Sequence, residues 1–228
     1  MPLTEVFGGF EPARMREFAA GLLLGAALML APAFILGVTG SVRWQPGGAD
    51  GGAVGSALLL MAGVALTEEL LFRGFLFQRL IGGLGFWPAQ IIVGGFFVLT
   101  HLGNPGMDGD TRVWASVNIF AASVLFGLAY GRTRSLAMPV ALHFAANVTQ
   151  GVLLGFGVSG GEQPSLLIPR FTNDLDWLTG GEFGLEASLP GLLAVIGAVG
   201  LLAWRRNSGK HQALADEHTS RTQARSHL

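Results

Sequence analysis

The sequence contains no cysteine, which excludes disulfide bonds, thiol catalysis and cysteine-based zinc sites. It is also poor in charge: Asp, Glu, Lys and Arg make up 13% of the 228 residues, against about a quarter in a typical soluble domain. The HExxH motif of a conventional zinc-protease helix is absent as well. These absences argue against a soluble, disulfide-bonded or zincin-type protein.

What the sequence does contain is apolar residues, which make up 50% of the chain and give a mean hydropathy of +0.51. They form uncharged blocks of about 18 to 22 residues, enough for a helix to cross a bilayer core of roughly 30 Å. Backbone that is exposed to lipid must satisfy its own hydrogen bonds, so these blocks should be helical. The sequence therefore predicts an all-α, polytopic membrane protein. No nucleic-acid partner is expected.

Six transmembrane helices are expected, separated by segments rich in glycine, proline and charge. They cover residues 18–38, 53–78, 87–102, 113–130, 138–157 and 190–204. The second is long and is expected to leave the membrane near Arg79. Residues 1–206 should form one transmembrane domain with an intramembrane cavity, and residues 207–228 a polar, flexible cytoplasmic tail.

The distribution of basic residues predicts the orientation. With the N-terminus in the cytoplasm, the outer loops hold only Arg43, Arg112 and Arg170. The cytoplasmic segments hold ten: Arg14, Arg16, Arg79, Arg132, Arg134, Arg205, Arg206, Lys210, Arg221 and Arg225. This bias follows the positive-inside rule, so both termini should be cytoplasmic in a prokaryotic cell membrane.

The N-terminal region has some features of a cleaved signal peptide, namely Arg14, Arg16 and the sequence "APAF" at residues 31–34. Three glutamates interrupt its positive region, however, and the apolar run continues to Val38. We therefore expect an uncleaved first helix.

The predicted helices contain few ionisable residues: Glu68, Glu69, Arg73, His101 and His143. Two glutamates and an arginine facing lipid would cost on the order of 8 to 10 kcal/mol on insertion scales. Such residues should therefore face the interior of the bundle, pair with one another and serve a function.

Helical spacing suggests separate tasks for these residues. Glu69 and Arg73 are four residues apart and can pair, whereas Glu68 points about 100° away from Glu69. One carboxylate can thus be neutralised by Arg73 while the other remains for chemistry. His143 and Asn147 also share a helical face, and helix tilt can bring all these groups to one depth in the membrane.

Two glutamates, two histidines and an asparagine suit a hydrolase that activates water. A carboxylate in a desolvated site can act as the general base. The imidazoles and the amide oxygen, from His101, His143 and Asn147, can bind a divalent metal such as zinc or stabilise an oxyanion. The alternatives are purely structural: a Glu–Arg pair that only holds two helices together, and histidines that only form hydrogen bonds and packing contacts within the bundle.

Two further patterns have simpler interpretations. The sequence "GVSGG", residues 157–161, matches the G-x-S-x-G pattern of serine hydrolases. No histidine follows within the membrane to act as its base, so a glycine-rich turn is expected. Small-xxx-small patterns occur at residues 21–25, 127–131 and 151–155, and they fit packing within the monomer as well as dimerisation.

Three motifs resemble those of the CPBP family, the CAAX prenyl protease and bacteriocin-processing (Abi) family. They are "EELLFR" at residues 68–73, "FVLTH" at 97–101 and "HFAAN" at 143–147, and the resemblance covers about residues 57–154. It implies an intramembrane endopeptidase that acts on a membrane-associated peptide or a lipidated protein. It also implies that Glu68 and His101 activate water, that Arg73 holds Glu69, and that His143 and Asn147 bind a metal or stabilise the oxyanion.

Two other functions compete with this interpretation. The chain could be a non-catalytic immunity or partner-binding protein on the same scaffold, because some members of the family are linked to bacteriocin immunity. It could also be a small ion or proton-coupled transporter whose Glu and His residues relay protons. No inverted repeat or symmetric pair of broken helices supports the transporter.

Overall fold

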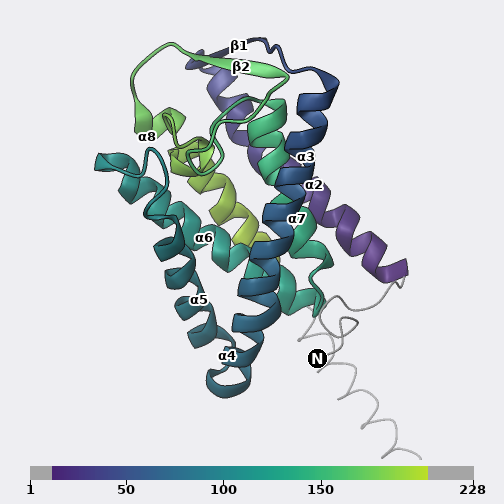
Figure 1. Cartoon of the computed structure of the whole chain (residues 1–228). Helices are drawn as coiled ribbons and strands as arrows, with labels where there is room; N and C mark the ends of the chain where they lie inside the picture. Colours follow the sequence, from purple (N-terminus) through teal and green to yellow (C-terminus); the bar gives the residue numbers. More distant parts are fainter. Residues whose placement is uncertain (1–11, 205–228) are drawn as a thin grey trace, which may run out of the picture.

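The computed structural model describes residues 12–204, which form a bundle of helices with a small sheet at one end (Figure 1). Residues 1–11 and 205–228 lie outside the described part, and so does the tail expected at residues 207–228. In chain order the elements are α2 (Pro12–Val38), β1 (Val42–Pro46), α3 (Gly51–Glu69), the π-helix η1 (Leu70–Leu76), α4 (Phe77–Leu84), α5 (Phe86–His101), α6 (Gly109–Thr133), α7 (Ala137–Asn147), the π-helix η2 (Val148–Leu153), β2 (Leu167–Phe171), α8 (Asp176–Thr179), the 3-10 helix η3 (Leu185–Ala187) and a final helix Leu189–Trp204.

The expected all-α membrane architecture is confirmed. Three helical stretches are long and apolar enough to cross a membrane, namely Pro12–Val38, Gly51–Leu84 and Gly109–Thr133, and two shorter apolar helices are Phe86–His101 and Leu189–Trp204. All six predicted spans are helical over most of their length. The second stretch extends to Leu84, beyond the predicted end at residue 78.

The fifth predicted span was too long at its C-terminal end. Helical structure stops at Leu153 rather than at residue 157. Gly155 has a φ of 75°, and a Cβ there would lie against the carbonyl oxygen of Leu167 at the start of β2. Only glycine readily adopts this backbone conformation and allows so close an approach. The chain therefore turns at Gly155 into the segment that leads to the sheet.

The sheet was not expected from the sequence. Strands β1 and β2 pair antiparallel, with Val42 opposite Phe171 and Pro46 opposite Leu167. The indole of Trp44, in β1, donates a hydrogen bond to the carbonyl oxygen of Leu154 at 3.0 Å. The sheet thus joins the loop after α2 to the segment after η2 at one end of the bundle.

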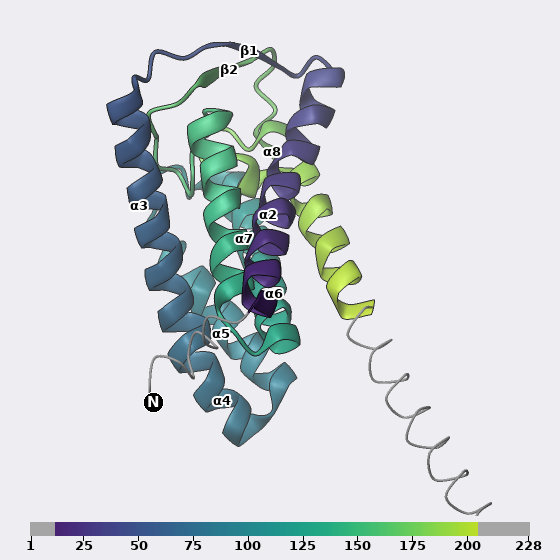
Figure 2. The same ribbon diagram turned by 90° about the vertical axis from the view of Figure 1, so that its right-hand side faces the viewer.

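Close contact between α2 and α7 positions the helix that carries His143. A Cβ on Gly21 would lie 2.5 Å from the carbonyl oxygen of Met138, and one on Gly25 would collide with that of Leu142. Figure 2 shows the two helices side by side. Since only hydrogen atoms fit at these two positions, α2 and α7 approach backbone to backbone.

The glycines of the other two small-residue patterns also pack closely against side chains of the same chain. A Cβ on Gly127 would collide with the side chain of Gln90, and one on Gly131 would collide with the ring of Phe86. A Cβ on Gly151 would lie 2.6 Å from Val158. Packing within the monomer therefore accounts for all three patterns.

We expect Gly25→Ala to destabilise the fold by about 1–3 kcal/mol, the usual cost of overpacking, because its neighbours on α7 are backbone atoms. The matched control is Gly63→Ala in α3, where nothing lies within 4 Å of the added Cβ. There, alanine should stabilise the helix by roughly 0.5–1 kcal/mol. Denaturant unfolding in detergent measures both, and equal effects would contradict the close α2–α7 contact.

Candidate active site

A buried ion pair lies where α3 passes into η1. The Nη1 of Arg73 donates to Oε1 of Glu69 at 3.0 Å, and both side chains are fully buried. This is the pair that the four-residue spacing predicts. Leaving either charge unpaired inside the bundle would be costly, so the pair fixes both side chains.

Arg73 reaches across the bundle to α6. Its Nη2 donates to the backbone oxygen of Ser123 at 3.1 Å and to the Ser123 hydroxyl at 2.8 Å, and Nε2 of Gln90 donates to the same backbone oxygen at 3.0 Å. The guanidinium carbon also lies over three rings, those of Phe72 at 5.8 Å, Phe97 at 5.0 Å and Phe126 at 4.9 Å. The aromatic rings and the Ser123 contacts compensate for removing this cation from water.

His143 connects the ion pair to the second glutamate. Its Nδ1 lies 3.1 Å from Oε1 of Glu69, and its Nε2 lies 3.8 Å from Oε2 of Glu68. The imidazole stacks on Phe126, with centroids 4.9 Å apart and planes 16° apart. Because an ionised carboxylate can only accept, Nδ1 carries the proton and Nε2 presents a lone pair in the neutral ring.

His101 has the same tautomer for a different reason. Its Nδ1 lies 2.7 Å from the carbonyl oxygen of Phe97, one helical turn earlier, and a carbonyl oxygen can only accept. The ring also packs edge-on against Phe97 at 4.6 Å. The Nε2 of His101 is therefore left as the lone-pair nitrogen of the neutral ring.

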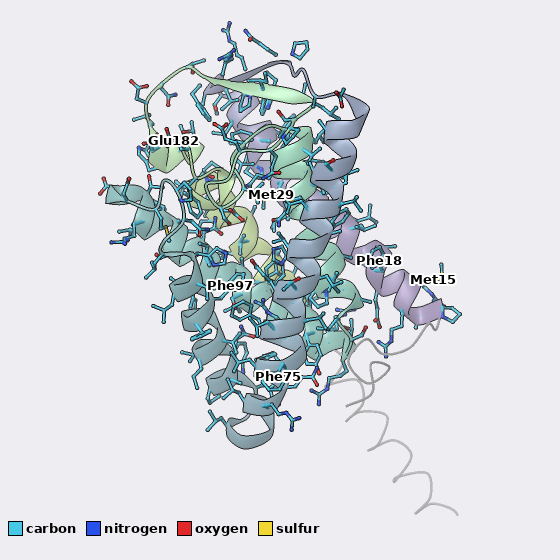
Figure 3. All side chains as sticks on the ribbon, viewed as in Figure 1. Met15, Phe18, Met29, Phe75, Phe97 and Glu182 are labelled. Carbon is cyan, nitrogen blue, oxygen red and sulfur yellow. The ribbon has the colours of Figure 1, made fainter. Side chains whose placement is uncertain are left out.

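Four of the six predicted residues line one cavity of about 350 Å³: Glu68, His101, His143 and Asn147. They come from α3, α5 and α7. Figure 3 labels Met29 and Phe97, two apolar residues of the same wall, in the interior of the bundle. Glu69 and Arg73 do not line the cavity and instead lie fully buried behind it. The six residues thus form two groups: four that line the cavity, and the buried pair of Glu69 and Arg73 behind them.

The helices that carry the first and third motifs change to π-helix after Glu69 and after Asn147, and Arg73 lies within the first π-helix. The first, η1, begins at Leu70, one residue after Glu69, and the second, η2, begins at Val148, one residue after Asn147. Short π-helical insertions widen the helix and re-aim side chains, and they are frequent at functional sites.

Sequence reasoning missed several polar residues of the cavity wall. Asn118 of α6 is buried, with 3% of its surface exposed, and lines the cavity beside the ionisable groups. A single asparagine in the apolar run "SVNIF" was the available signal for it. Four more polar residues lie farther along the wall, three in loops and the last in η3: Asn104, Ser159, Gln163 and Glu186.

The G-x-S-x-G sequence forms a turn. Ser159 has a φ of 48°, and the backbone of Val158 pairs with that of Gly161. The Ser159 hydroxyl and backbone N–H both donate to Oε2 of Glu186, at 3.0 and 2.7 Å. The hydroxyl thus contacts a carboxylate rather than a histidine base, as expected for a structural turn.

The site partly fits a divalent metal. Each histidine places Nδ1 on an acceptor and keeps Nε2 as a lone-pair donor, which is the usual arrangement of metal-binding imidazoles. The described residues nevertheless contain no group of three or more His, Cys, Asp or Glu side chains that could hold a metal ion. A bound ion would therefore need the Asn147 amide or water in addition to the histidines.

Comparison with known proteins agrees with this geometry. Residues 51–149, a range that includes all six candidate residues, match the family described as type II CAAX prenyl endopeptidase Rce1-like. The match agrees with the resemblance of the three sequence motifs to the CPBP/CAAX protease family. The uncharacterized protein YyaK of Bacillus subtilis (strain 168) is 34% identical over 95 residues. That match covers 41% of this chain and 31% of the relative, so it leaves most of the relative unmatched. No solved structure matches the chain.

Arg73→Ala should destabilise the fold by about 3–5 kcal/mol, because it leaves Glu69 buried without its cation. The control is Arg112→Ala, which removes an exposed arginine and should change the unfolding free energy by no more than about 0.5 kcal/mol. Both values can be measured by denaturant titration in detergent micelles. A loss for Arg73→Ala as small as the control's would contradict a structural role for the pair.

Proposed function

We propose that the protein is an intramembrane endopeptidase that hydrolyses a peptide bond of a membrane-associated or lipidated substrate. The observation that carries the proposal is the shared cavity, into which Glu68, two imidazoles and an asparagine amide converge. A structural ion pair would explain Glu69 and Arg73 alone. It would not explain a second carboxylate that lines a cavity.

Glu68 is the general base in this proposal. Its side chain is 28% exposed, and its Oε2 has no hydrogen-bond partner within the protein. The 3.8 Å between this oxygen and Nε2 of His143 is too long for a direct hydrogen bond. The carboxylate can therefore take a proton from water as the water oxygen attacks the carbonyl carbon, and later pass it to the leaving amine.

The remaining residues orient the attacking water and stabilise the oxyanion. In their neutral forms His101 and His143 have only acceptor lone pairs at Nε2, so they can orient an attacking water but cannot donate to the oxyanion. The Asn147 amide can donate through its NH₂ group, as can Asn118, which lines the same wall. Glu69 acts through His143, whose tautomer it sets, and is a positioning residue.

A divalent metal such as zinc is a further part of the proposal. His101, His143 and Asn147 would hold it, and a bound zinc would supply Lewis acidity at the carbonyl oxygen. The tautomers of both histidines support this assignment. The roles of Glu68 and Glu69 described above do not depend on it.

We expect Glu68→Gln to lower peptide cleavage by about 10²–10⁴-fold, the usual contribution of a general base, while the folded protein stays stable. The matched control is Glu182→Gln, an exposed glutamate that is not part of the cavity wall. Mass spectrometry of a membrane-peptide library after incubation with each purified variant measures cleavage. Identical product profiles for the wild type and Glu68→Gln would favour the non-catalytic partner protein.

The metal assignment has its own test. Purified protein dialysed against Zn²⁺ should retain bound metal, and His143→Ala should lose it while Glu182→Gln keeps it. Elemental analysis by mass spectrometry gives the zinc content directly. Equal zinc contents in the wild type and His143→Ala would contradict the metal assignment and leave the general-base proposal in place.

A further inference from the structure

The cavity extends from the candidate residues in one direction only. In α3 its wall residues Leu60, Met61 and Val64 all precede Glu68. In α5 the wall is formed by Phe97 and His101, in the last turns of the helix. On α3 the wall therefore runs from Glu68 toward the end of the bundle with the sheet. Beyond His101 it continues at that same end with Asn104 and Pro105 (Figure 1).

The opposite direction is closed. No wall residue lies within the ranges 69–96 or 127–142 of the described chain. Those ranges supply the buried groups behind the cavity: Arg73 and Phe77 have no exposed surface, and Gln90 has 1%. The ion pair and its aromatic neighbours thus form a floor, and nothing in the cavity passes beyond them.

The open end is polar and partly exposed to solvent. The wall there is formed by Asn104 and Pro105 of the loop after α5 and by Ser159, Gln163 and Glu186 of the segment after η2. Pro105 is exposed, and the other four are half-buried. In Figure 3, Glu182 lies at this end of the bundle and Phe75 at the other, with Met29 and Phe97 between them.

Charge distinguishes the two ends. Among the described residues the closed end carries five arginines: Arg14, Arg16, Arg79, Arg132 and Arg134. The Nη1 of Arg14 donates a hydrogen bond to the carbonyl oxygen of Thr133, which links α2 to the end of α6. The open end carries three arginines and eight acidic residues: Asp50, Asp108, Asp110, Glu162, Asp174, Asp176, Glu182 and Glu186. The positive-inside rule places the closed end in the cytoplasm.

We propose, on the basis of the proposed function, that the substrate reaches Glu68 from the extracytoplasmic side of the membrane. The substrate class that fits is a membrane peptide whose apolar segment carries a basic or polar extracytoplasmic flank. The apolar wall receives the segment, and the acidic residues at the open end of the bundle attract the flank. A lipidated C-terminus presented in the cytoplasm would meet the closed floor instead.

The absence of cysteine makes a direct test possible, because any cysteine introduced is the only thiol in the chain. The variants are Asn104→Cys at the mouth, Ala122→Cys and Ala146→Cys in the cavity wall, and Arg79→Cys at the closed end as the control. Intact cells are treated with a small, membrane-impermeant cationic thiol reagent before and after permeabilisation. We expect the mouth and cavity variants to react in intact cells, and Arg79→Cys only after permeabilisation.

The reverse pattern, with Arg79→Cys labelled in intact cells and Asn104→Cys protected, would overturn the proposal. So would an Asn104→Cys that reacts from outside while both cavity variants stay unlabelled from either side, because the cavity would then not open at that end. Labelling requires no turnover. A chain that shows the expected labelling but cleaves no peptide in detergent would contradict the proposed function and leave the access route standing.

Discussion

The buried pair of Glu69 and Arg73 is the interaction on which the rest of the site depends. It joins four elements, since Glu69 ends α3, Arg73 lies in η1, Ser123 of α6 accepts from the guanidinium, and His143 of α7 contacts the carboxylate. Burial makes the pair costly to form and still more costly to break on one side. The helices that carry the candidate residues are therefore fixed relative to one another by a group that itself never reaches the cavity.

This arrangement assigns the two adjacent glutamates to different environments. Glu69 has no exposed surface, and its Oε1 contacts Arg73 and His143. Glu68, one residue earlier, lines the cavity with a side chain that is 28% exposed. A rotation of about 100° along the helix is enough to separate them. A hydrolytic site in a membrane needs both environments. The buried pair holds its charges away from water and sets the tautomer of His143, whereas the cavity gives water access to Glu68.

The features that could be predicted from the sequence are those for which the alternative would cost a large free energy. Charges in a membrane helix must pair or line a cavity, so Glu68, Glu69 and Arg73 were identifiable as a functional group, and the long apolar runs marked the helices. Neutral polar residues cost far less, so Asn118, Gln90 and Ser123 left no comparable signal. The π-helices after Glu69 and Asn147, the turn at Gly155 and the β1–β2 pairing depend on contacts between distant segments, which helical periodicity does not contain.

The central claim is that the buried pair presents a lone-pair nitrogen of His143 to the cavity. Nitrogen NMR of ¹⁵N-histidine-labelled protein tests this most directly, because it shows which ring nitrogen carries the proton. The account predicts Nδ1-protonated tautomers for the neutral rings of His101 and His143, and a change at His143 alone in a Glu69→Gln variant. A His143 protonated at Nε2 in the wild type, or one insensitive to Glu69→Gln, would contradict it.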